Sequence, residues 1–290
     1  MNTVWSTRIQ GVKTLYYSRK LRFDDAFSAQ YKALLGLDPN KNLKILEIGC
    51  GPGALAGALR RWFPNAEITA IDRDAEFIRF AKEHEQGVQF MEADATALPF
   101  PDEYFDVTIS NTVSEHIEPS AFYGEQRRVL KKKGVCIVLS SRKGISVSAP
   151  CLAENETEQA FWKKAAQFDD SFEKFCIGKY AVNEAELPLS MEKQGFHSLS
   201  TGFVCIPLTP DNPNCPQKTA IAIIEAEKFG ALEAVDSVLT SMPEHFTVRE
   251  VEDVKAIVEQ KFENRLRDYQ AGKKYWDTSL SVIMVVRGIK

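Results

Sequence analysis

The residues of this 290-residue sequence that are best suited to chemistry lie in Glu47-Ile-Gly49-Cys-Gly51-Pro-Gly53 and at Asp72. The glycines follow an apolar run and precede a helical pattern, where residues without a Cβ allow a tight turn and close approach of a ligand to the backbone. Asp72 ends a second apolar run, nineteen residues after Gly53, where a carboxylate can accept hydrogen bonds from both hydroxyls of a ribose. The pattern therefore predicts a site for an adenosine-containing ligand.

The glycine spacing bears on which adenosine ligand is bound. A dinucleotide fingerprint, G-x-G-x-x-G/A, would place its last small residue at Ala54 or Ala56, and alanine is permitted there. Pro52 fits that reading poorly, because it removes a backbone N–H that could bind phosphate. Nicotinamide binding is therefore disfavoured, although spacing alone does not exclude it.

Three further polar positions follow later apolar runs. Asp94, with Ala95 next to it, comes after the third run, and Asn111 and His116 come after the fourth. An imidazole with its ordinary pKa of about 6.5 can remove a proton from a hydroxyl or an ammonium group near neutral pH. His116 is therefore a candidate catalytic base.

The elements that must position these residues alternate between short apolar runs and helical patterns. Such alternation predicts a parallel sheet with helices on both faces. Asp74 is a suitable N-cap for the second helix. The expected strands are residues 43–49, 67–72, 88–91, 105–110 and 134–140, and the expected helices between them are 54–63, 74–83 and 120–131.

The rest of the chain predicts more helix than strand. Two capping boxes, Asn183 with Glu186 and Thr247 with Glu250, each open a helical pattern. The other expectations are helix-like residues at 151–181, strands at 196–207 and 279–286, and amphipathic helices at 217–240 and 247–270.

Composition excludes several classes of protein. Hydrophobic residues make up 44% and charged residues 26%, as in globular proteins, and the formal net charge of −4 argues against coating of nucleic acid or of an anionic membrane. The six scattered cysteines favour reduced thiols over a disulfide framework or a zinc site, so no metal is expected. No apolar run reaches the ~20 residues that a membrane span needs, and the first twenty residues lack the apolar core of a signal peptide. We therefore expect a cytoplasmic protein without membrane or nucleic-acid partners.

The segment from residue 44 to residue 140 resembles the class I S-adenosylmethionine-dependent methyltransferases. Their first motif, E/D-x-G-x-G-x-G, matches Glu47 to Gly53, and Asp94-Ala-Thr-Ala-Leu-Pro-Phe100 resembles their D-A-x-x-L-P-F segment. The resemblance implies an α/β, Rossmann-like, doubly wound sheet of seven strands in the order 3-2-1-4-5-7-6, with the last strand antiparallel and with helical insertions. It also implies S-adenosyl-L-methionine as the cofactor, bound by Glu47, Gly49, Cys50, Gly51, Gly53, Asp72, Arg73, Asp94, Ala95 and Asn111. In the family the aspartate at the position of Asp94 accepts a hydrogen bond from the adenine amino group.

The resemblance is strongest to enzymes of this family that act on small molecules. Residues 111–114 read Asn-Thr-Val-Ser instead of the N-P-P-F/Y of nucleobase amine methylases, and Glu115-His-Ile117 fits the small-molecule branch. Arg128-Val-Leu-Lys-Lys-Lys-Gly134 resembles R-V-L-K-P-G-G, although Lys132 and Lys133 replace the proline and glycine. We expect the lysines to lie in a solvated turn before the fifth strand.

The predicted organisation has three parts. Residues 1–40 would form a helical lid, 41–206 with 278–290 the methyltransferase core, and 207–277 a helical insertion that caps the substrate or contacts a second copy in a homodimer. Tyr16, Tyr17, Arg19 and Arg142 are the candidate residues for binding the acceptor. The expected function is methyl transfer to a small molecule by in-line displacement. A non-catalytic cofactor-binding or scaffold protein and, less favoured, a nicotinamide-dependent oxidoreductase remain as alternatives.

Overall fold

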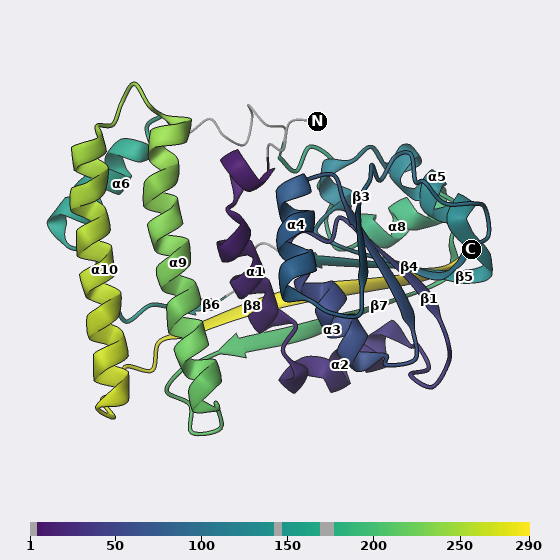
Figure 1. Ribbon diagram of the computed structural model, residues 1–290, viewed down its shortest axis with the longest axis horizontal. Helices are drawn as coiled ribbons and strands as arrows, with labels where there is room; N and C mark the ends of the chain where they lie inside the picture. Colours follow the sequence, from purple (N-terminus) through teal and green to yellow (C-terminus); the bar gives the residue numbers. More distant parts are fainter. Residues whose placement is uncertain (1–4, 142–146, 169–176) are drawn as a thin grey trace.

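The computed structural model describes residues 5–141, 147–168 and 177–290. In this part of the chain, eight strands form one sheet, which lies beside a smaller unit of helices (Figure 1). The C-terminus lies at the end of the sheet that is distant from the helical unit.

The sheet has the strand order β3-β2-β1-β4-β5-β8, with β7 and the short β6 both paired to β8. The strands β1 to β5 are parallel to one another, and β8 is antiparallel to β5, β6 and β7. The predicted fold class and seven-strand order are thus confirmed, and β6 is an added eighth strand. The bounds are β1 Lys44–Ile48, β2 Glu67–Asp72, β3 Gln89–Glu92, β4 Phe105–Asn111, β5 Leu130–Ser141, β6 Val147–Ala149, β7 His197–Leu208 and β8 Thr278–Ile289.

Helices cover both faces of the sheet, as the near-continuous apolar strands require. Successive residues of β1 show this, because side chains alternate between the faces of a strand. Ile45 belongs to a core cluster on the side of α1, α2 and α3, whereas Leu46 belongs to a cluster on the side of α5 and α8. The bounds of the helices around the sheet are α1 Val12–Arg22, α2 Ser28–Leu35, α3 Ala54–Trp62, α4 Ala75–His84, α5 Pro119–Val129 and α8 Glu186–Lys193.

The helical unit has a hydrophobic core of its own. α9 (Gln217–Ser241) and α10 (Val248–Gln270) pack along each other, and α6 (Glu156–Ala165) packs against α10. Ile224, Val254 and Phe161, one residue from each helix, meet in the same buried cluster. The predicted helices 217–240 and 247–270 match α9 and α10, and the Thr247–Glu250 capping box is present. α6 lies outside residues 207–277 but packs with this unit.

The N-terminal segment lies between the helical unit and the sheet. A short π-helix, η1 (Trp5–Ile9), precedes α1, and α1 packs against α9 on one side and against α3 and α4 on the other (Figure 1). The described residues also include two single-turn 3-10 helices, η2 (Asp25–Phe27) before α2 and η3 (Ser114–His116) after β4.

Two local expectations differ from the structure. Helix is shorter than expected in residues 151–181, because α6 ends at Ala165 and residues 177–180 form a turn; the part from 169 to 176 lies outside the described residues. The lysine run does not form a separate turn before the fifth strand. It belongs to β5, where the register shifts between the pairs Phe105–Leu130 and Val107–Val135, and Lys131 binds Asp106.

Candidate ligand-binding site

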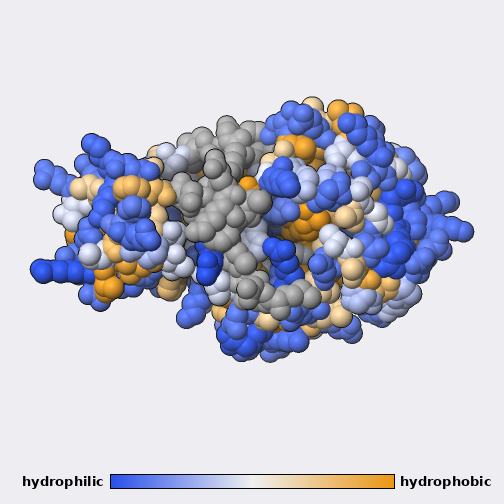
Figure 2. Space-filling model, turned by 90° about the horizontal axis from the view of Figure 1, so that it is seen from above, coloured by the Kyte–Doolittle hydropathy of each residue, from blue (hydrophilic) through white to orange (hydrophobic). Residues whose placement is uncertain are grey.

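A cavity of about 360 Å³ opens at the carboxyl ends of β1, β2 and β4, where open α/β sheets bind their ligands. Hydrophobic residues gather near the middle of the sheet-containing half of the molecule in the view from above (Figure 2). The described walls of the cavity include most of the predicted cofactor residues, together with Arg19 and His116. Those predicted residues are Glu47, Gly49, Cys50, Gly51, Asp72, Arg73, Asp94, Ala95 and Asn111.

The glycine loop is shaped by its contacts with neighbouring segments. Gly49 has φ +67°, and a Cβ there would lie 2.4 Å from Val113 Cγ2, so this position requires glycine. Gly53 has φ +92°, and its Cβ would lie 2.9 Å from Ala81 Cβ on α4. Gly53 is not among the described residues of the cavity wall, so its structural effect is to let α3 and α4 pack closely.

Asp72 fixes the geometry of the loop from the end of β2. Its Oδ2 accepts a hydrogen bond from the Gly51 N–H at 2.8 Å, and its Oδ1 accepts one from the Asp74 N–H at 2.9 Å. Burial raises the pKa of the Asp72 carboxyl, and the two backbone hydrogen bonds oppose that rise. The carboxylate therefore lies at the cavity wall, oriented by the backbone before any ligand arrives.

The turn after β3 forms the adjoining wall. The Ala93 N–H donates to the carbonyl oxygen of Asp72 at 3.0 Å, which ties this turn to the end of β2. Asp94 Oδ1 accepts from the N–H and the hydroxyl of Thr96, at 2.8 and 2.7 Å. These hydrogen bonds lower the pKa of the Asp94 carboxyl, so it is ionised at neutral pH.

Two buried hydrogen-bond acceptors lie on β1 and β4, on the opposite side of β2 from the turn after β3, and so define a second end of the cavity. Glu47 Oε2 and Asn111 Oδ1 have no hydrogen-bond partner in the described part of the chain, although both residues line the cavity and are buried. Such orphaned acceptors are costly unless a donor reaches them. Burial raises the pKa of the Glu47 carboxyl well above its ordinary value. A ligand with a cationic donor would satisfy both atoms.

Arg19 brings a positive charge to the same end. Its guanidinium extends from α1 to the loop after β4, where it donates to the Asn111 carbonyl oxygen at 3.4 Å and to Thr112 Oγ1 at 2.5 Å. No carboxylate lies within ion-pair distance of it among residues 5–141, 147–168 and 177–290, and burial lowers the pKa of Arg19 to about 10. Acceptors at Glu47 and Asn111 together with this cation match the ammonium and carboxylate of an α-amino acid.

His116 lies where the cavity meets η1. The ring of Trp5 contacts the imidazole edge-on, with the centroids 4.8 Å apart, and the Gly178 N–H donates to His116 Nδ1 at 3.0 Å. Because Nδ1 accepts this hydrogen bond, the neutral ring carries its proton on Nε2. Proton uptake at Nδ1 would break the bond to Gly178, so this geometry does not favour His116 as a base.

The structure does not bring to the cavity all the residues that are predicted to bind the methyl acceptor. Tyr16 and Tyr17 are not among the described residues of its wall. The Tyr16 hydroxyl is directed to Glu85 at 2.8 Å, and Tyr17 stacks on Phe229 of α9. Both tyrosines thus attach α1 to neighbouring helices. Arg142 lies outside the described residues.

Several wall residues have no motif in the sequence. They come from the N-terminal segment and from the segment after residue 176; examples are Trp5, Gln10, Leu15 and Tyr180. Ser6 fastens η1 by donating its N–H and hydroxyl to Asp74, and the Tyr180 N–H donates to the Glu115 carbonyl oxygen. The sequence signal that could have identified some of these wall residues is the presence of aromatic residues in the terminal and helical segments. Aromatic residues at such positions, however, more often pack in the hydrophobic core.

Known proteins resemble part of this chain in sequence and nearly all of it in fold. Residues 46–138 match the family model described as "Methyltransferase domain". A fatty-acid O-methyltransferase from Mycolicibacterium smegmatis is 36% identical over 103 residues, which are 34% of this chain and 37% of that protein. A demethylmenaquinone methyltransferase from Thermotoga maritima is 33% identical over 97 residues, which are 33% of this chain and 42% of that protein. The match therefore spans about two fifths of the length of these curated relatives.

Among solved structures, phosphoethanolamine N-methyltransferase 2 from Haemonchus contortus, in complex with S-adenosyl-L-methionine, has a TM-score of 0.53 at 15% sequence identity. The superposition covers 99% of this chain and 59% of that one. Residues 46–138 are thus similar to the methyltransferase-domain family, and the chain has the class I methyltransferase fold. Among the described residues, no helix combines the length and the apolar character needed to cross a membrane.

Proposed function

We propose that this protein transfers a methyl group from S-adenosyl-L-methionine to a small-molecule acceptor. The observation that supports this most strongly is the division of one cavity into two chemically different ends. Asp72 and Asp94 offer carboxylates at one end, and Glu47, Asn111 and Arg19 offer acceptors and a cation at the other. An adenosine joined to an amino acid has complementary groups at both ends.

At the adenosine end, Asp72 would accept hydrogen bonds from the ribose hydroxyls. Asp94 would accept one from the adenine amino group, and the Ala95 N–H would donate to a ring nitrogen. The hydrogen bonds from Gly51 and Thr96 already hold the two carboxylates in place, so little ordering is required on binding. Arg73, next to Asp72 in the same wall, would add positive charge beside the sugar.

At the amino-acid end, Glu47 and Asn111 would accept hydrogen bonds from the ammonium group. Arg19 would pair with the carboxylate in a charge-assisted bond. In this arrangement the ammonium group donates hydrogen bonds to Glu47 Oε2 and Asn111 Oδ1, which otherwise lack a partner, and the carboxylate is the counter-ion of Arg19. Cys50, Gly49 and Gly51 would form the floor between the two ends.

Methyl transfer needs alignment more than acid–base catalysis. The sulfonium of the bound cofactor supplies a methyl group that is already activated for in-line attack. The protein must hold the acceptor opposite the sulfur and exclude water, and such positioning is worth up to about 7–11 kcal/mol. Trp5, His116 and Tyr180 are suited to hold the methyl acceptor, because they line the same cavity as the proposed cofactor residues. We propose that His116 orients the acceptor and does not remove its proton.

Similarity to a fatty-acid O-methyltransferase and a demethylmenaquinone methyltransferase supports a small molecule as the acceptor. A nicotinamide-dependent oxidoreductase is less well supported, because Pro52 lines the cavity where a phosphate would need an N–H. A non-catalytic cofactor-binding or scaffold protein stays the alternative to an enzyme. The lid role of the N-terminal segment, location in the cytoplasm and a homodimer through the helical unit remain predictions.

The test is a calorimetric titration of the purified protein with S-adenosylhomocysteine, with NADH as the control ligand. We expect micromolar binding of S-adenosylhomocysteine and no heat from NADH. Binding of NADH alone would overturn the proposal in favour of an oxidoreductase. Binding of neither ligand would overturn it in favour of a scaffold.

A further inference from the structure

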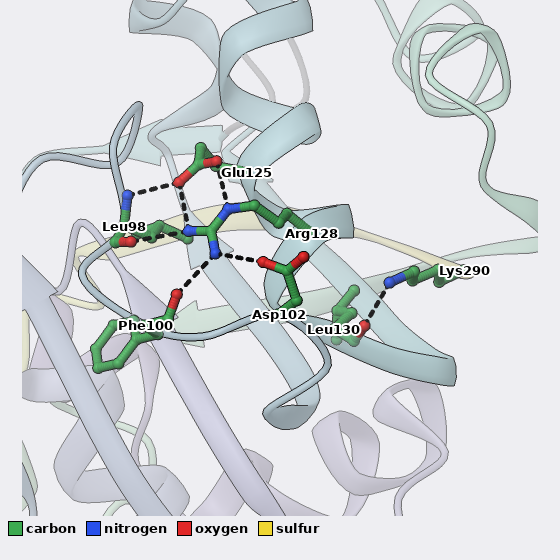
Figure 3. A network of polar contacts seen from close by, with 7 residues as sticks. All are labelled: Leu98, Phe100, Asp102, Glu125, Arg128, Leu130 and Lys290. Carbon is green, nitrogen blue, oxygen red and sulfur yellow. Dashed lines mark hydrogen bonds and ion pairs between the residues drawn. The ribbon is translucent and has the colours of Figure 1, made fainter.

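Arg128, in the last turn of α5, holds the loop that follows the Asp94 turn. Its Nη2 donates to the Leu98 carbonyl oxygen at 2.8 Å, and its Nη1 donates to the Phe100 carbonyl oxygen at 2.7 Å (Figure 3). Its Nη1 also reaches Asp102 Oδ1 at 2.9 Å. One guanidinium therefore fixes three points along residues 98–102.

Glu125, one turn earlier on α5, completes the network. It accepts two hydrogen bonds from Arg128, at Nε and Nη2, both at 2.8 Å. Its Oε2 also accepts the Leu98 N–H at 2.7 Å, so both backbone groups of Leu98 are held by α5 (Figure 3). The pairing lowers the pKa of Glu125 and raises that of Arg128, and this keeps both ionised at neutral pH. Arg128 thus engages Nε, Nη1 and Nη2 together, which the single ammonium of lysine cannot reproduce.

This network is mechanically connected to the cavity. Asp94, Ala95 and Thr96 line the cavity, and Leu98 follows after only one more residue, Ala97. The Leu98 side chain is buried in the core cluster under α5, with 4% of it exposed. A change in how Leu98 is held would therefore move the turn whose carboxylate and N–H groups face the ligand.

We propose that Arg128 is a positioning residue that sets the selectivity of the cavity for adenine over other purines. This inference rests on the proposed function, in which Asp94 and Ala95 read the adenine edge. Arg128 itself is not among the described residues of the cavity wall. It acts by fixing the distance between the Asp94 turn and α5. At this distance the Asp94 carboxylate accepts a hydrogen bond from the amino group of adenine, whereas the oxygen at the same position of hypoxanthine offers it no donor.

The network does more than a surface ion pair could. The Asp102 side chain is 74% exposed, so its pairing with Arg128 contributes little by itself. The bonds to the two carbonyl oxygens and to Glu125 involve a side chain that is only 32% exposed. Selectivity should therefore depend on the guanidinium and only weakly on Asp102.

The experiment compares the dissociation constants of S-adenosylhomocysteine and S-inosylhomocysteine for the parent and three variants. Arg128→Lys keeps the charge but loses the fork, Asp102→Asn removes the exposed partner only, and Arg79→Lys is the control. Arg79 on α4 also pairs with carboxylates one turn away, at Glu76 and Glu83, but binds no loop carbonyl in the described part of the chain.

We expect Arg128→Lys to weaken S-adenosylhomocysteine binding about tenfold, or about 1.4 kcal/mol, with a much smaller effect on the inosine analogue. The preference for adenine would therefore shrink, whereas Asp102→Asn and Arg79→Lys would retain it. Equal weakening of both ligands in Arg128→Lys, or an unchanged preference, would overturn the positioning role. A parent protein that binds neither ligand would instead overturn the proposed function, so the two failures are distinct.

Discussion

The two ends of the cavity are built in different ways. The proposed adenosine end consists of residues at and just after the ends of β2 and β3, whose carboxylates are already bonded to neighbouring backbone N–H groups. The other end combines Glu47 and Asn111, which are buried with orphaned acceptors, with Arg19 and Trp5 from a segment far away in sequence. The first end is preorganised by the sheet, whereas the second becomes fully bonded only with a ligand. We therefore expect mutations at the first end to damage binding most and mutations near the acceptor to change turnover more selectively.

The largest effect is expected at the preorganised end. Asp72→Ala removes the acceptor that orients the Gly51 and Asp74 N–H groups and would bind the ribose. Because hydrogen bonds to a charged group contribute about 1.5–3 kcal/mol, S-adenosylhomocysteine affinity should fall roughly 100-fold. Calorimetry of Asp72→Ala checks this, with Asp253→Ala on the exposed side of α10 as the control. An affinity equal to that of the parent would place the ligand elsewhere.

A somewhat smaller effect is expected at Glu47. Glu47→Gln keeps an acceptor but loses the charge opposite the ammonium group, so affinity should fall about 30-fold. Glu67→Gln, an exposed glutamate on the neighbouring strand, is the control and should bind like the parent. If both variants bind equally well, the ammonium does not lie at Glu47.

Glu47 also predicts a pH dependence. Its pKa is raised in the free protein by burial, and an ammonium ligand favours its ionised form. Binding should therefore release a proton and strengthen, by up to about tenfold per pH unit, as the pH rises toward the raised pKa of the free protein, and it should become constant above that pKa.

The same shift predicts that the free protein loses stability as the pH rises from about 4.5, the ordinary pKa of a glutamate, to the raised pKa of Glu47. The unfolded chain releases the Glu47 proton at lower pH than the folded chain does, so raising the pH favours unfolding until the folded carboxyl has also ionised. For ligand binding, calorimetry in buffers of different ionisation enthalpy measures how many protons are released. Glu47→Gln should abolish the part of this release that comes from Glu47. Proton uptake on binding would contradict the assignment.

Mutations of the residues that are proposed to hold the methyl acceptor should have a different effect on binding. Trp5→Ala removes an aromatic wall that contacts His116, so the KM for the acceptor should rise about tenfold while the affinity for S-adenosylhomocysteine changes little. The assay uses the acceptor found by screening fatty acids and quinones. Trp276→Ala, which removes an exposed tryptophan near β8, is the control. Equal losses of cofactor and acceptor binding would erase the distinction between the two ends.

The smallest effect is expected at His116. His116→Gln retains hydrogen-bonding capacity, and a residue that only orients the acceptor should cost about threefold in kcat, compared with the 10²–10⁴-fold typical of a general base. The pH profile of kcat gives the second readout and should keep its shape. A loss above about 100-fold together with a lost ionisation in that profile would instead identify His116 as the base.

The same contrast explains what sequence can predict. The strands and Asp72, Asp94 and Glu47 are legible because local periodicity and glycine spacing fix their place at the carboxyl edge of the sheet. Trp5 and Tyr180 reach the cavity through bonds such as Ser6 to Asp74, across 68 residues, which leave no local pattern. Tyr16 belongs to the predicted lid segment and is therefore a candidate for binding the methyl acceptor, but its hydroxyl is directed to Glu85 and its ring is buried.

The most direct test of the central claim is a crystal structure of the protein with S-adenosylhomocysteine. We predict the adenine amino group within hydrogen-bond distance of Asp94, the ribose hydroxyls at Asp72, the ammonium at Glu47 and Asn111, and the carboxylate at Arg19. A ligand bound in the reverse direction, or outside this cavity, would contradict the two-ended site on which the proposed function depends.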